Sequence, residues 1–248
     1  MTDPLRIVLE RDAFVVVDKP SGLLSVPGIG PGKDDCVASR VRAMFPRAGG
    51  PLIVHRLDMD TSGLIVVGLT EHAQRELSAQ FERRTVVKSY VARLERCPEH
   101  PAGAIEVPIR LDVERRPYQV VDFEQGRPSL TRYRVLDAGT ARVEFEPLTG
   151  RTHQIRVHAA FGGQTHWPAR DPDRAAPRAM IQPPPAPRVG LGSPVLGDPL
   201  YGVPAPETSA HARPGLEPPA RLCLHAAMLE FNDPDSGERV RVTSEASF

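Results

Sequence analysis

His55-Arg56-Leu57-Asp58-Met59-Asp60-Thr61-Ser62-Gly63 is the stretch on which the interpretation of the whole chain depends. Short apolar runs lie on both sides of it, at residues 52–54 and 64–67, and turn residues bound each run. Such short, β-branched runs are typical of buried strands. The sequence therefore predicts a charged loop held between two rigid strands.

Asp58 is the residue of this loop that indicates chemistry. Its carboxylate lies two residues from Arg56 and three from His55, so a nucleophile, a cation and a polar side chain can face one cleft. Aspartates between strands also commonly cap turns through their own backbone, and Asp58 and Asp60 both fit that use. The loop by itself leaves the catalytic and the turn-capping interpretations open.

Further motifs follow a recognisable order along the chain. HRLDMDTSG resembles the signature of the RluA-type pseudouridine synthases, and the other motifs of that family occur here in the same order. The likeness is to the short form of the family, which lacks the N-terminal RNA-binding domain of longer members. The matching segments are residues 19–28 (KPSGLLSVPG), 88–92 (KSYVA), 150–158 (GRTHQIRVH), 196–202 (LGDPLYG) and 221–226 (RLCLHA).

This resemblance implies an RNA pseudouridine synthase, an isomerase that converts uridine to pseudouridine in structured RNA loops and needs no metal or cofactor. It implies that Asp58 is the catalytic carboxylate and that Arg156 pairs with it. Tyr90 is expected to stack on the target base and to help move the final proton from carbon 5. Whether Asp58 adds to the anomeric carbon or removes the neighbouring ribose proton stays open.

The implied substrates are position 32 in the anticodon loop of tRNA, a hairpin loop of large-subunit rRNA, or both. The target base must leave the stack, and Arg56 is expected to fill the vacated space. The residues expected to contact RNA are Arg56, His55, Lys88, Arg151, His153 and Gln154.

The resemblance implies an α+β fold with a mainly antiparallel mixed sheet in two halves, flanking helices and a central cleft. Residues 1–248 are expected to form one catalytic domain. Helices are predicted from Asp34 or Asp35 as N-cap to Phe45, from Thr70 as N-cap over Ala73, Leu77 and Phe81, and over residues 152–161. Strands are predicted at residues 6–9, 13–17, 86–94, 105–111, 130–136, 142–145, 222–231 and 239–242.

A proline-rich insertion, residues 163–195, departs from the family pattern. More than half of the 27 prolines lie between residues 168 and 219, and proline sustains neither a helix interior nor a central strand. We expect a loop or a disordered segment that could change access of RNA to the site.

Composition sets independent limits. The 248 residues include 31 basic and 31 acidic side chains, so an RNA site must be a local patch. The three cysteines favour a reducing compartment, and neither a membrane span nor a signal peptide is recognisable. A cytoplasmic monomer without an obligate protein partner is expected. An arginine cluster offers either such an RNA patch or a solvated sheet face, and it comprises Arg110, Arg115, Arg116, Arg127, Arg132 and Arg134.

Two other functional classes remain open from the residues. A metal-dependent phosphoesterase could use carboxylate and imidazole ligands, and the candidates are His55, Asp58, Asp60 and His153. Insensitivity to chelators would exclude it. A non-catalytic RNA-binding module is the second alternative, but binding alone has no need for a buried carboxylate such as Asp58 beside RNA phosphate.

Overall fold

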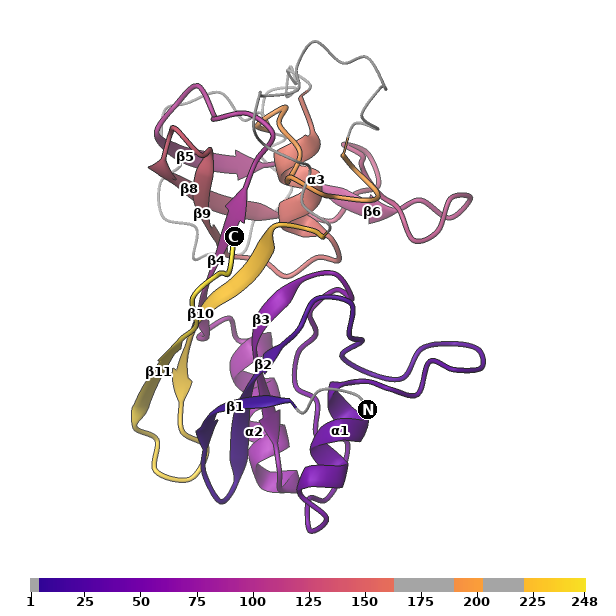
Figure 1. The fold of residues 1–248 in the computed structure, drawn as a ribbon, viewed down its shortest axis with the longest axis vertical. Coiled ribbons are helices and arrows are strands. Elements are labelled where there is room, and N and C mark those ends of the chain that lie inside the picture. Colours follow the sequence, from indigo (N-terminus) through magenta and orange to yellow (C-terminus); the bar gives the residue numbers. More distant parts are fainter. Residues whose placement is uncertain (1–4, 163–189, 203–220) are drawn as a thin grey trace. The chain divides into compact units, whose positions relative to one another are not determined.

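The computed structural model describes residues 5–162, 190–202 and 221–248 (Figure 1). The chain forms two compact units. The first contains the N-terminal strands and the last two strands, and the second contains the central part of the chain. Most of the predicted insertion, residues 163–189, lies outside the described residues. The prediction of one catalytic domain over residues 1–248 stays a prediction.

The first unit is built on a sheet with the strand order β1-β2-β3-β10-β4, and β11 pairs with β10. Only β3 and β10 run parallel, while the other pairs in this unit are antiparallel. The strands are β1 (Arg6–Glu10), β2 (Phe14–Lys19), β3 (Ser62–Gly68), β4 (Val87–Arg93), β10 (Leu224–Asn232) and β11 (Arg239–Thr243).

Two helices, α1 (Val37–Met44) and α2 (Glu71–Glu82), cover the two faces of this sheet. Alternate residues of a strand point to opposite faces. Phe14 and Val16 therefore pack with Leu77 of α2, and Val15 and Val17 pack with α1. Burial on both faces explains why β2 and β3 are almost continuously apolar.

The N-cap of α2 is Thr70, as predicted, and its side chain accepts a hydrogen bond from the Ala73 N–H. The predicted cap of α1 is wrong. Cys36, not Asp34 or Asp35, precedes the first helical residue, and its sulfur accepts from the Ser39 N–H. Asp35 instead forms an ion pair with Arg40 at 2.7 Å.

The second unit contains the antiparallel strands β9-β8-β5, a separate two-stranded sheet of β6 and β7, and α3. Ile105, Val143 and Phe145 are fully buried here. The elements are β5 (Ala102–Glu106), β6 (Ile109–Leu111), β7 (Gln119–Val121), β8 (Leu130–Asp137), β9 (Arg142–Pro147) and α3 (Gln154–Ala160). Three helices and mostly antiparallel strands in the described residues confirm the predicted α+β class.

Three predicted elements differ from the structure. Residues 52–54 form no strand, because Leu52 has a φ of 60°, and only Ile53 makes an isolated bridge, to Val67. The strand predicted at residues 105–111 is divided between β5 and β6, which pair with different partners. The helix predicted over residues 152–161 is shorter, because His153 is left-handed with a φ of 54°.

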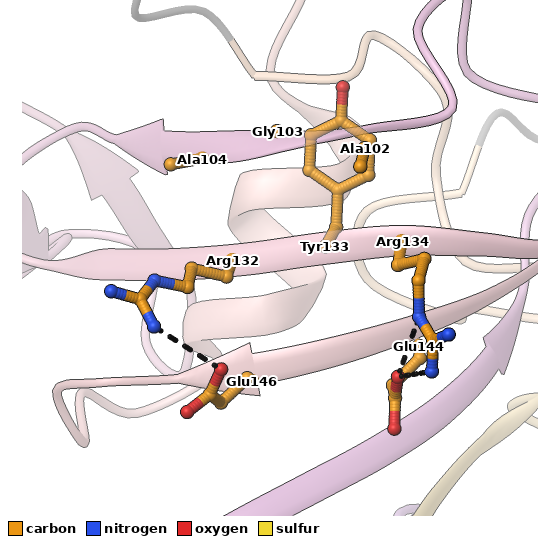
Figure 2. A pocket seen from close by; sticks show the side chains of 8 residues that line it. All are labelled: Ala102, Gly103, Ala104, Arg132, Tyr133, Arg134, Glu144 and Glu146. Carbon is orange, nitrogen blue, oxygen red and sulfur yellow. Dashed lines mark hydrogen bonds and ion pairs between the residues drawn. The ribbon is translucent and has the colours of Figure 1, made fainter. Parts of the chain in front are cut away.

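Four of the six arginines of the cluster pair with carboxylates. On one face of β8 and β9, Arg132 lies 3.8 Å from Glu146 and Arg134 lies 2.7 Å from Glu144 (Figure 2). Arg110 likewise pairs with Asp122, and Arg115 with Asp112. This arrangement favours the interpretation of a solvated sheet face, and the use of these arginines as an RNA patch stays a prediction.

Candidate active site

The loop that carries Asp58 is clamped by the segment immediately after β2. Lys19 is fully buried, and its Nζ donates to the carbonyl of Met59 at 2.8 Å. The same ammonium donates to the carbonyls of Pro20 and Leu23 at 3.0 and 2.7 Å. Since an ammonium has three donors, Lys19 is fully satisfied and ties the loop to its own segment.

Two serines of the same segment complete the clamp. The Ser21 hydroxyl donates to the Asp60 carbonyl at 2.7 Å. The Ser25 hydroxyl donates to the Leu57 carbonyl at 2.8 Å and accepts from the Leu57 N–H at 3.1 Å. The backbone on both sides of Asp58 is therefore fixed by residues 19–25, which is how two motifs distant in sequence form one structure.

Lys19 brings a positive charge to the loop. Burial lowers the pKa of Lys19 to about 8, while the nearby carboxylates of Asp58 and Asp60 raise it. Lys19 is therefore still mainly protonated at neutral pH, and a buried cation lies near the two aspartates of the loop.

Tyr90 of β4 lies in the electrostatic field of Asp58. Burial, and secondly the negative charge of Asp58, raise the pKa of the Tyr90 phenol above its usual value. The phenol therefore stays protonated at neutral pH. A protonated ring suits stacking on a base better than it suits proton abstraction from carbon 5.

His55 stabilises the structure of the loop. Its Nε2 accepts a hydrogen bond from the Val66 N–H at 3.1 Å, and its ring stacks on Phe81 with centroids 4.3 Å apart. Burial, and secondly the charge of Lys88, lower the pKa of His55 to about 3. A neutral imidazole whose Nε2 is already used inside the unit is a poor metal ligand and a poor phosphate contact.

Arg56 and Lys88, the other predicted RNA contacts of the first unit, differ in exposure. Arg56 is exposed, whereas Lys88 is half-buried, and its pKa is lowered by burial and by the charge of Arg84. In the described residues no group of three or more His, Cys, Asp or Glu side chains could hold a metal ion. The engaged Nε2 of His55 argues against its use as a metal ligand in the phosphoesterase alternative.

Arg156 of α3 is held by a bidentate ion pair within the second unit. Its Nε and Nη2 donate to the two carboxylate oxygens of Asp198 at 2.8 and 2.6 Å, and both side chains are almost completely buried. The N–H groups of Leu200 and Tyr201 also donate to Asp198. The Tyr201 ring lies under the guanidinium, 5.3 Å from Cζ.

The remaining predicted contacts lie around the start of α3. The Gln154 amide is buried and makes four hydrogen bonds, accepting at Oε1 and donating at Nε2 to Leu130 and Thr131. This geometry favours a structural part for Gln154. The His153 Nδ1 lies 2.8 Å from the Tyr201 hydroxyl, and Arg151 donates to the Pro128 carbonyl.

Comparison with known proteins decides the family. A sequence model described as RNA pseudouridylate synthase matches residues 13–161. The chain is 38% identical to the dual-specificity RNA pseudouridine synthase RluA of Escherichia coli K12 over 98% of this chain and 94% of that protein. It belongs to the RNA pseudouridylate synthase family. The Yersinia pestis RluA is 39% identical over 98% of this chain and its own full length.

Solved structures of the family have the same fold. The human RNA pseudouridylate synthase domain containing 1 aligns with a TM-score of 0.67 and 29% identity, over 99% of this chain and 86% of that one. The human RNA pseudouridylate synthase domain containing 4 aligns with a TM-score of 0.66 and 23% identity. At this identity the likeness shows the fold alone. The chain is an RNA pseudouridine synthase, an isomerase that acts on uridine in RNA.

Some residues that hold these side chains in place within each unit were not predicted. Lys19, Asp198 and Tyr201 all lie in motifs that matched the family, but the sequence assigned them no part. The partner of Arg156 in the second unit is Asp198. The pairing of Arg156 with Asp58 stays a prediction.

Proposed function

We propose that Asp58 is the carboxylate that starts the isomerisation. The observation that carries this proposal is the clamp of residues 19–25, which fixes the backbone on both sides of Asp58 and holds the Lys19 ammonium beside it. A carboxylate that is ionised and rigidly placed is what both possible first steps require.

The reaction breaks the bond between the anomeric carbon and N1 of uracil. Asp58 either adds to the anomeric carbon or removes the neighbouring ribose proton. The base then rotates and carbon 5 bonds to the anomeric carbon, while Asp58 either leaves the anomeric carbon or returns the proton to the ribose. The proton of carbon 5 leaves, and N1 gains a proton. No electron is gained or lost overall, so no redox cofactor is needed.

The other residues have parts that follow from their surroundings. Tyr90, protonated and close to Asp58, stacks on the flipped base. Arg56 is exposed beside Asp58 and fills the space that the base leaves. Arg151, His153 and the half-buried Lys88 contact the RNA backbone, whereas His55 and Gln154 act by holding the loop and the start of α3.

We propose that the RNA substrates are the tRNA anticodon loop at position 32, a hairpin loop of large-subunit rRNA, or both. The relatives from Escherichia coli and Yersinia pestis are named dual-specificity RNA pseudouridine synthases, and each is aligned over nearly its full length. Uridines in such loops are partly unstacked, which reduces the cost of flipping.

A cytoplasmic monomer without an obligate protein partner or a membrane anchor completes the proposal. None of the helices in the described parts of the chain is long and apolar enough to cross a bilayer. The bacterial relatives that align over nearly their full length are named RNA pseudouridine synthases.

Tritium release from RNA labelled at carbon 5 of uridine tests this function. The enzyme is given a tRNA anticodon stem-loop and an rRNA hairpin in parallel, with chelator present and Asp58→Asn as the control. Release from either RNA that disappears in the variant supports the proposal and ranks the substrates. Release that persists in the variant contradicts the part given to Asp58, and release that depends on a metal contradicts the cofactor-free mechanism.

A further inference from the structure

A continuous chain of side-chain hydrogen bonds crosses the first unit beside the start of β3. Arg221 Nη1 lies 3.2 Å from Ser62 Oγ, and Ser62 Oγ lies 2.9 Å from His225 Nδ1. His225 Nε2 lies 3.2 Å from Ser244 Oγ, which donates to the Asp18 carboxylate at 2.6 Å. Ser62 and His225 are 6% and 4% exposed, so solvent cannot easily replace these bonds.

The chemistry of the Asp18 end fixes the position of one proton. A carboxylate oxygen accepts, so the Ser244 hydroxyl uses its proton on Asp18 and accepts the proton of His225 Nε2. Ser62 accepts from Arg221, and its own proton can go to His225 Nδ1 or to the Leu224 carbonyl, 3.4 Å away. The chain therefore requires a proton on His225 Nε2.

Ser62 places this chain directly behind the catalytic loop. It is the first residue of β3, and the preceding Thr61 donates its N–H to the Asp58 carbonyl at 3.1 Å. The backbone of Ser62 also pairs with His225 in the parallel ladder of β3 and β10. The C-terminal end of the loop is therefore fixed by side chain and backbone together.

The two ends of the loop have anchors that meet at the end of β2. Lys19 holds the Met59 carbonyl, and its neighbour Asp18 ends the chain that passes through His225. Ser244 follows β11 directly, and its N–H donates to the Ala227 carbonyl at 2.9 Å. The hydrogen-bond chain thus links Ser62 to Asp18 of β2, to His225 of β10 and to Ser244, the residue after β11.

We infer that His225 is a positioning residue for Asp58, acting through Ser62 with a proton on Nε2. This inference rests on the proposed catalytic part of Asp58. A displacement of about 1 Å at a reacting group can reduce a rate by about a hundredfold. His225→Leu, which removes both ring nitrogens, should therefore slow the chemical step without weakening RNA binding.

The test compares His225→Leu, His225→Gln and Ser244→Ala with wild type, and uses His72→Leu as the control. His72 is an exposed histidine of α2 in the same unit. Folded fraction is measured by circular dichroism, RNA affinity by titration, and the chemical step by single-turnover tritium release. Selective ¹⁵N labelling of histidine gives the tautomer of His225, whose signal is assigned by its loss in His225→Gln.

We expect His225→Leu to lower the single-turnover rate about ten- to a hundredfold with the Kd for RNA changed less than about threefold. His225→Gln keeps a donor near the position of Nε2 and should recover part of the rate, and Ser244→Ala should lose less than His225→Leu. His72→Leu should behave as wild type. A folded His225→Leu with the wild-type rate overturns the inference, and so does a neutral His225 at pH 7 whose only ring proton is on Nδ1.

If His225→Leu does not fold, the rates of His225→Gln and Ser244→Ala decide the matter. Wild-type rates in both overturn the inference. Failure of this inference can be told apart from failure of the proposed function. If the proposed function is wrong, Asp58→Asn keeps the wild-type rate. If only the inference is wrong, Asp58→Asn is inactive and the His225 variants keep the wild-type rate. The tautomer of His225 is read without any turnover.

Discussion

Gly63→Ala should cost much stability, because the added methyl group would meet both a strained backbone and the backbone of a neighbouring strand. Gly63 has a φ of 111°, a conformation that alanine rarely adopts. A Cβ at this position would lie 2.4 Å from the Ala226 carbonyl oxygen and 2.5 Å from the Ala226 nitrogen. These atoms belong to the backbone of β10, the parallel neighbour of β3, so no side-chain rotation relieves the overlap.

Gly22→Ala separates the cost of the strained backbone from the cost of the steric overlap. Gly22 has a φ of 86°, but a Cβ there meets nothing within 4 Å. Strained backbone of this kind costs about 1–3 kcal/mol, which is the whole effect expected at Gly22. Relieving the overlap at Gly63 requires β3 and β10 to separate, and we expect a total loss of about 4–5 kcal/mol there.

Urea unfolding followed by far-ultraviolet circular dichroism measures both variants against wild type. The free energy of unfolding should fall by at least about 1 kcal/mol more in Gly63→Ala than in Gly22→Ala. Equal losses within about 0.5 kcal/mol would refute the close approach of β3 and β10 beside the catalytic loop.

Three further substitutions test the buried polar groups. Lys19→Met leaves three carbonyls without their donor and should lower the free energy of unfolding by about 2–4 kcal/mol in urea titrations, with an unchanged value contradicting the clamp. Burial lowers the pKa of His158 from 6.5 to about 4, so the folded protein binds fewer protons than the unfolded chain between these values and loses stability as the pH falls. His158→Gln should remove about 2–3 kcal/mol of that acid-induced loss of stability between pH 6.5 and 4. An identical pH dependence of the free energy of unfolding in His158→Gln and wild type would contradict the lowered pKa of His158. Asp198→Ala leaves the buried Arg156 without its carboxylate and should cost about 3–5 kcal/mol, whereas Asp198→Asn keeps an acceptor and should cost less, as melting temperatures would show.

Local patterns predicted most of the first unit. The apolar runs of β2 and β3 and the Thr70 cap of α2 are signals contained within a few residues, and the structure has them where the sequence indicates. The cap of α1 was missed because a cysteine sulfur is a weak acceptor, so Cys36 carries no capping signal. Residues 52–54 have strand composition, but the left-handed Leu52 prevents a continuous ladder.

The charged loop at residues 55–63 was located from the sequence, but the residues that support it were not. Lys19 is 40 residues from Met59, and Asp198 is 42 residues from Arg156. Such pairings depend on how the strands assemble, and no spacing rule within one segment reveals them. His153 and Gln154 were expected to face RNA because they are polar and near the start of a helix, yet the Gln154 amide is satisfied inside the second unit.

Single-turnover tritium release by Asp58→Asn tests the central claim most directly, with Asp60→Asn as the matched neighbour and RNA affinity measured in parallel. The account predicts that Asp58→Asn binds the substrate RNA with a Kd within about threefold of wild type and releases no tritium, while Asp60→Asn still releases it. Tritium release by a folded Asp58→Asn at the rate of Asp60→Asn would contradict the assignment of Asp58 as the residue that starts the reaction.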